Sequence, residues 1–262
     1  MTGGGAGLVG HQFRYDLTIF RRNRQGRFFT VALPVILLIL LASIFHNDTF
    51  TVDGHRVPAA TYYVSHLLAL GIVSASFVNL IVSIAAQRES GILKRRRSTP
   101  VPAWVLIAAR SLVAVITSLL VVVTLIGIGR IFYGVAIPTT TLPGLVVTTL
   151  VGSASFCCLG YAVTSLVRNQ DSAQPVTQAI VLPLYFVSGV FVATSLLPSW
   201  LLDIGRVFPV YHLAQACWTP FNPATSGLGI AWTDLAVVAA WGALGLAVAL
   251  ARFSWMPLGG GA

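Results

Sequence analysis

Long apolar stretches separated by short polar segments form the dominant pattern along the 262 residues of this chain. Six stretches approach the roughly 20 apolar residues with which a helix crosses a hydrocarbon core about 30 Å thick. They are Phe28–Phe45, Tyr62–Ala86, Ser111–Phe132, Leu145–Val167, Ala173–Val192 and Trp232–Ala251. The pattern predicts an all-α integral membrane protein with six transmembrane helices. Because the connecting segments are short, we expect residues 1–262 to form a single transmembrane domain.

The segment before the first stretch, residues 8–23, has a different pattern. Val9, Phe13, Leu17 and Phe20 recur at helical spacing and share one face, while most of the charged residues lie elsewhere. A helix of this kind lies in the membrane interface, with its apolar face against lipid and its arginines near anionic head groups. We therefore predict an N-terminal interfacial helix that contacts membrane lipids.

Residues 193–230 are too apolar for an ordinary loop, and four prolines interrupt them too often for a straight span. Their tryptophans and tyrosine are typical of a membrane–water interface. Two short helices near Ser199–Phe208 and Tyr211–Thr219, dipping into the outer leaflet, would fit this pattern. Irregular backbone at that depth must be covered by protein or water. The segment is therefore predicted to be an outer re-entrant region.

The last apolar stretch carries a stripe of small side chains. Ala239, Ala243, Ala247 and Ala251 follow one another at a spacing of four residues. Small residues on one helix face allow a neighbouring helix to approach closely in a membrane. The stripe therefore predicts the packing face of this helix, although alanine is abundant in the chain.

Composition agrees with a membrane class: 56% of the residues are hydrophobic, 9% are charged and the mean hydropathy is +0.85. The basic residues that give the net charge of +9 are distributed as membrane topology requires, and this distribution argues against nucleic acid as a partner. With the N-terminus inside, 13 Lys and Arg residues lie inside and 3 outside. The outer three are Arg56, Arg130 and Arg206. Both termini are thus expected in the cytoplasm of a bacterium, with the protein in the plasma (inner) membrane.

Catalytic and metal chemistry have no visible basis in the sequence. The five histidines are scattered without the paired spacing of a metal site, and the three cysteines show no zinc spacing. The chain is therefore expected to be no enzyme and to hold no cofactor. All seven acidic residues lie at or near loops or span ends. This argues against an ion-coupled secondary transporter of hydrophobic compounds, which we keep as the alternative.

Polar residues inside two spans are candidates to line a translocation path. An uncharged interior suits a hydrophobic or amphipathic substrate better than an ion, although the same polar residues equally serve helix packing. The candidates are Ser74, Ser76 and Asn79 in the second span, and Gln178, Tyr185, Ser188 and Gly189 in the fifth.

A basic segment between the second and third spans, residues 87–102, carries the strongest motif. It contains RESGIL at Arg88–Leu93 and STPV at Ser98–Val101. Further along are FVSGVF at Phe186–Phe191, LPSWL at Leu197–Leu201 and FPV at Phe208–Val210. In this order, within six spans, these pieces resemble the type-2 ABC exporter permeases, the membrane subunits of bacterial drug, lipid or polysaccharide export of the daunorubicin-resistance type.

The resemblance implies a short cytoplasmic coupling helix in residues 87–102, which docks on a separate ABC ATPase. The coupling residues would be Arg88, Glu89, Gly91, Leu93, Thr99 and Pro100. It implies two ATPase copies that hold ATP and Mg, and a second permease subunit, identical or homologous. The exporter would move a drug, a lipid or a lipid-linked glycan outward, a role compatible with antibiotic efflux. In agreement, the chain has no phosphate-binding loop of the form GxxxxGK[ST].

Overall fold

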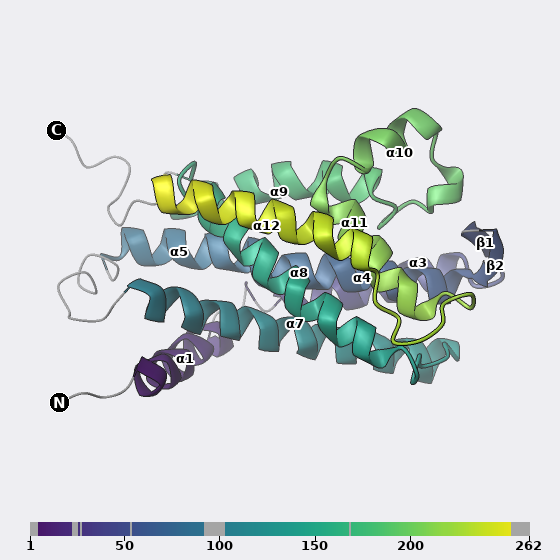
Figure 1. Ribbon diagram of the computed structural model, residues 1–262, viewed down its shortest axis with the longest axis horizontal. Coiled ribbons are helices and arrows are strands. Elements are labelled where there is room, and N and C mark those ends of the chain that lie inside the picture. Colours follow the sequence, from purple (N-terminus) through teal and green to yellow (C-terminus); the bar gives the residue numbers. More distant parts are fainter. Residues whose placement is uncertain are drawn as a thin grey trace.

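The computed structural model describes residues 5–22, 26, 28–52, 54–91, 103–167 and 169–252. These residues are mostly helical (Figure 1). The α-helices are α1 (Gly5–Arg22), α3 (Leu33–Ile44), α4 (Ala59–Val73), α5 (Asn79–Glu89), α7 (Ala103–Tyr133), α8 (Leu142–Val163), α9 (Gln170–Val187), α10 (Ser199–Gly205), α11 (Pro209–Trp218) and α12 (Trp232–Arg252). Two π-helical turns, Phe28–Ala32 and Ser74–Val78, precede α3 and join α4 to α5, and short 3-10 turns lie at Thr194–Leu196 and Thr219–Phe221.

Four helical segments of the described chain are long and apolar enough to cross a membrane: Ala59–Glu89, Ala108–Tyr133, Leu142–Val163 and Trp232–Ala251. They overlap the second, third, fourth and sixth predicted spans. The first predicted span contains a shorter apolar helix, Thr30–Ile44. The fifth coincides with α9, whose first turns are polar. The protein is therefore a multi-pass, largely helical membrane protein, and the crossing of these two helices stays a prediction.

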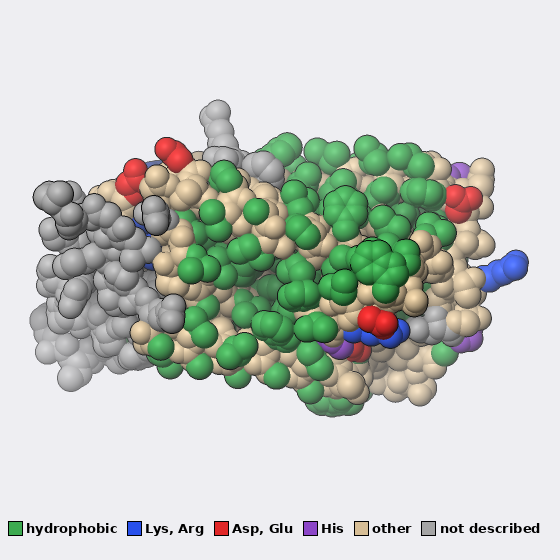
Figure 2. Space-filling model, turned by 90° about the horizontal axis from the view of Figure 1, so that it is seen from above, with side chains coloured by type: hydrophobic (Ala, Val, Ile, Leu, Met, Phe, Trp, Pro, Cys, Tyr) green, Lys and Arg blue, Asp and Glu red, His purple; other side chains and the backbone are tan. Residues whose placement is uncertain are grey.

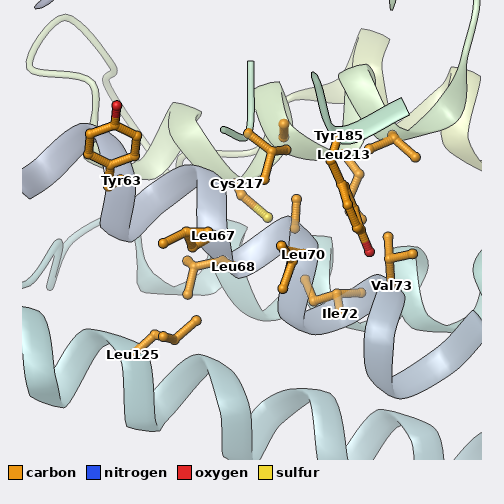
Figure 3. Packing of buried hydrophobic residues seen from close by; sticks show 14 of the residues in the cluster. Tyr63, Leu67, Leu68, Leu70, Ile72, Val73, Leu125, Tyr185, Leu213 and Cys217 are labelled. Atoms are coloured by element: carbon orange, nitrogen blue, oxygen red, sulfur yellow. The ribbon is translucent and has the colours of Figure 1, made fainter. Parts of the chain in front are cut away.

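The segment formed by α4, the π-turn and α5 is the centre of the bundle. Of the 18 residues that form its most apolar part, 83% are buried, whereas only 28% are buried in the most apolar 18 residues of α12. Leu213 and Cys217 of α11 and Tyr185 of α9 face this segment from one side, and Leu125 of α7 faces it from the other (Figure 3). Burial on all sides explains why this span is apolar around its whole circumference.

The two ends of the bundle differ in structure (Figure 1). At one end lie α1, the last turn of α5, the start of α7 and the last turns of α12. At the other lie α10 and an antiparallel hairpin of β1 (Thr49–Val52) and β2 (His55–Pro58), in which Phe50 pairs with Val57. This hairpin departs from the predicted all-helical fold, because Gly54 at a φ of +79° provides the tight turn between the strands.

The outer surface of the bundle is apolar along its middle. On the face shown in Figure 2, hydrophobic side chains cover most of the long central part. Most acidic and basic side chains lie nearer the ends, and one group of them borders the apolar part. Exposed large side chains include Leu120 and Val123 of α7 and Leu250 of α12. Such a broad apolar belt matches lipid contact rather than water.

Candidate functional site

Arg88, in the last turn of α5, ties this helix to the end of α8. Its Nη1 donates to the backbone carbonyl oxygens of Thr164 and Val167, each at 3.1 Å, and the side chain is buried. The last carbonyls of a helix have no partners within it and carry partial negative charge. The guanidinium of Arg88 thus caps the C-terminus of α8 from a helix 76 residues earlier in the chain.

Glu89, the next residue, ties α5 to the start of α9. Its Oε2 accepts a hydrogen bond of 2.8 Å from the backbone N–H of Gln170, the first residue of α9. Asn169 caps the same helix, since its side chain accepts from the N–H of Ser172 at 2.9 Å. The carboxylate therefore lies at the positive end of the α9 dipole. Two adjacent side chains of opposite charge hold both sides of the α8–α9 turn, which spans residues 164–170.

Arg88 and Glu89 together form a junction between α5 and the α8–α9 turn, and Gly91 follows it in the chain. Its φ of +70° is a left-handed conformation that glycine adopts without strain, and its N–H bonds to the carbonyl of Arg88 at 3.2 Å. This left-handed backbone conformation explains why a glycine lies two residues after Glu89. The other predicted coupling residues, Leu93, Thr99 and Pro100, lie outside the described residues. The structure therefore places three of the six predicted coupling residues, and their role in coupling stays a prediction.

The N-terminal helix is attached near this junction by a buried ion pair. The guanidinium of Arg110 in α7 lies 3.9 Å from the carboxylate of Asp16 in α1, and both side chains are less than a tenth exposed. Arg110 also donates to the hydroxyl of Ser83 in α5 at 3.3 Å. The amphipathic pattern located this helix, but the pairing of Asp16 with Arg110 was not predicted, because the two residues are distant in sequence.

Two of the predicted path residues come together in the interior. The buried hydroxyl of Tyr185 on α9 lies near the side chain of Ser74, in the π-turn between α4 and α5, but makes no hydrogen bond within the described residues. Ser76, in the same turn, bonds back to the carbonyl of Ile72 at 2.5 Å and so serves its own helix. Asn79 and Gln178 are half-buried, and within the described residues no hydrogen bond joins them to the other candidates. The π-turn thus brings one pair of candidates together.

Ser188 and Gly189 end α9 at a buried turn held by Tyr62 of α4. The Tyr62 hydroxyl donates to the carbonyl of Gly189 at 2.6 Å and accepts from the N–H of Thr194 at 3.2 Å. Gly189 has a φ of +78°, and a Cβ there would lie 2.6 Å from Cγ2 of Thr194. The sequence identified the Ser-Gly pair but missed Tyr62, which lies 127 residues away.

A third unpredicted contact joins the predicted re-entrant region to α12. Nδ1 of His212 in α11 lies 2.7 Å from Oδ1 of Asp234, and Nε2 lies 2.8 Å from the carbonyl oxygen of Arg206. Trp241 of α12 adds a bond of 3.1 Å to the carbonyl of Val207. The short helices α10 and α11 are thus anchored to α12 through polar groups. Their location close to the predicted segments agrees with the proline and aromatic pattern.

The polar contacts between elements of the described chain mostly join one helix to another. Within the described residues no group of three or more His, Cys, Asp or Glu side chains could hold a metal ion. The polar contacts instead connect one helix to another: α5 to the α8–α9 turn, α1 to α7, α4 to the end of α9, and α11 to α12. Such contacts fix helix ends relative to each other inside an apolar bundle.

Comparison with known proteins identifies a family. A family model described as "ABC-2 family transporter protein" matches residues 56–251. The match begins in β2 and runs to the last turn of α12, so it contains the junction, the π-turn and the Ser-Gly turn. The chain is also 20% identical, over 199 residues, to a protein of Bacillus subtilis (strain 168) named "Putative transport permease YvfS". That alignment covers 75% of this chain and 78% of the relative.

Proposed function

Because the chain belongs to the ABC-2 transporter family, we propose that it is the membrane permease subunit of an ATP-driven exporter. A separate ATPase subunit would bind ATP and Mg, since the chain carries no phosphate-binding loop. Two ATPase copies would act on two permease subunits, identical or homologous, in the bacterial inner membrane. The alternative of an ion-coupled transporter gains no support from the family match.

The observation that carries the proposal is the Arg88–Glu89 junction within the family-matched region. It lies at the end of a buried central helix and reaches the ends of two further helices. A partner that pushes on residues 87–102 from the cytoplasm would therefore act on three helices at once. Movement of packed helices between two arrangements is the general way in which such a push opens or closes a path.

The substrate in this proposal is hydrophobic or amphipathic, such as a drug, a lipid or a lipid-linked glycan. The described interior is lined by aliphatic and aromatic side chains, and its polar members at the π-turn are uncharged. An uncharged path stabilises a bare ion poorly but accepts apolar surface. We infer that Ser74 and Tyr185 face this path when the helices separate.

The direct test is a tagged pull-down from native membranes in mild detergent, with mass identification of the bound chains. The proposal expects a co-purifying protein that carries a phosphate-binding loop. An unrelated multi-pass protein with the same tag, from the same membranes, is the control. Recovery of the chain alone, under conditions that preserve other ABC complexes, would contradict the proposal and favour a secondary transporter. Proteoliposomes of the complex, supplied with ATP and a panel of labelled amphiphiles, then define the substrate.

A further inference from the structure

The hydrogen bonds of Arg88 and Glu89 are made within the chain, and each matches the end of a different helix. The carbonyl of Thr164, the C-cap residue, lies at the negative end of α8, and that of Val167 lies in the turn that follows. The N–H of Gln170 lies at the positive end of α9. Because a cation is followed directly by an anion in the sequence, each charge lies against a backbone group of opposite partial charge. The reverse order would place a carboxylate against carbonyl oxygens and a guanidinium against an N–H.

We propose that Arg88 and Glu89 are positioning residues that join the end of α5, where the coupling segment begins, to the α8–α9 turn, so that these two parts move as one body. This inference rests on the proposed function, and it deepens it by assigning what the pair does. In this assignment Glu89 is required as a hydrogen-bond acceptor for the N–H of Gln170, and its charge is not required for contact with the ATPase. Motion imposed on residues 87–102 is thereby transmitted to α8 and α9.

A role of Glu89 as hydrogen-bond acceptor and a docking role of its charge can be separated with the amide variant. Glu89→Gln keeps an oxygen that accepts from the N–H of Gln170 but removes the charge that a docking role would need. Glu89→Ala removes both. Because Glu89 is exposed, neither variant leaves a buried group behind, whereas a variant of the buried Arg88 could simply fail to fold. Asp171→Asn is the matched control, since it removes an exposed charge from the first turn of α9, next to Gln170.

The measurements are ATP-driven export in proteoliposomes and the distance between spin labels at Ser90→Cys and Asp171→Cys. We expect Glu89→Ala to lower export about tenfold, equivalent to about 1.4 kcal/mol, with the ATPase still bound and the distance distribution broadened. Glu89→Gln should stay close to wild type in both measurements, and Asp171→Asn, which removes the second label position, should stay close to wild type in export.

Export by Glu89→Ala at the wild-type rate would overturn the assignment. So would a Glu89→Gln variant as defective as Glu89→Ala with an unchanged label distance, because charge rather than the hydrogen bond would then matter. A failure of the proposed function is distinguishable: no ATPase would accompany the wild-type chain. The label distances in the Glu89 variants would still support or refute the link between α5 and the α8–α9 turn.

Discussion

Gly189 shows how a single residue type is required by two independent constraints. Its backbone is left-handed, and a Cβ would meet both Cγ2 of Thr194 and the hydroxyl of Tyr62, at 2.6 and 3.0 Å. The Tyr62 hydroxyl cannot move away without giving up its bond to the carbonyl of Gly189. Any side chain at this position therefore strains the backbone and displaces the contact that holds the end of α9 to α4.

Gly189→Ala should consequently lower stability by more than backbone strain alone. The left-handed conformation costs a non-glycine residue about 1–2 kcal/mol, and overpacking adds about 1–3 kcal/mol. Gly134→Ala is the control, because Gly134 has a φ of +65° but a Cβ there would meet nothing within 4 Å. Thermal unfolding in detergent, followed by size-exclusion chromatography, measures both. Equal losses in the two variants would show that the contacts of Tyr62 and Thr194 contribute nothing.

At the scale of elements, α8 and α12 approach through glycines rather than alanines. A Cβ on Gly242 would lie 2.6 Å from Oγ of Ser155, and one on Gly245 would lie 2.8 Å from the backbone nitrogen of Leu159. The predicted stripe is placed differently, since Ala239, Ala243, Ala247 and Ala251 are all exposed. Small residues do mediate the packing of this helix, but they lie on the face next to the stripe.

A pair of neighbouring substitutions tests this assignment. Gly242→Leu places a bulky side chain into backbone of α8 and should destabilise the helix pair by about 3 kcal/mol or more. Ala243→Leu adds a side chain on the exposed face of α12 and should be tolerated within about 0.5 kcal/mol. The yield of monodisperse protein after heating reports both. Similar losses for the two variants would show that the stripe also packs against a neighbouring helix, which would contradict its placement on the exposed face.

The sequence predicted which segments are helical better than it predicted how they face one another. Apolar length located the four long apolar helices, and proline and aromatic patterns located α10 and α11. Rotation about the helix axis could not be derived for α12, because apolar residues lie on every side of this helix. The partners of Arg88 and Tyr62 were also out of reach, because they lie 76 to 132 residues away and involve backbone atoms, which leave no pattern in a single sequence.

At the scale of the whole molecule, the structure relates a buried central helix to two unlike ends. The junction of Arg88 and Glu89, the ion pair of Asp16 and Arg110 and the last turns of α12 lie toward one end (Figure 1). The hairpin and α10 lie at the other. The central segment α4–α5 runs between these ends and contacts most of the other helices. A push at the junction would therefore reach the opposite end along one continuous, largely buried path.

The proposed coupling path depends on the orientation of the molecule in the membrane, which the excess of basic residues predicts. Single cysteines at the exposed positions Ser90 and Ser226 test it, in a background with Cys157, Cys158 and Cys217 replaced by alanine. A membrane-impermeant maleimide should label Ser226→Cys in intact cells and Ser90→Cys only after permeabilisation. The opposite result would place Glu89 outside the cell, where no ATPase could act on it, and would remove the basis for coupling through the α8–α9 turn.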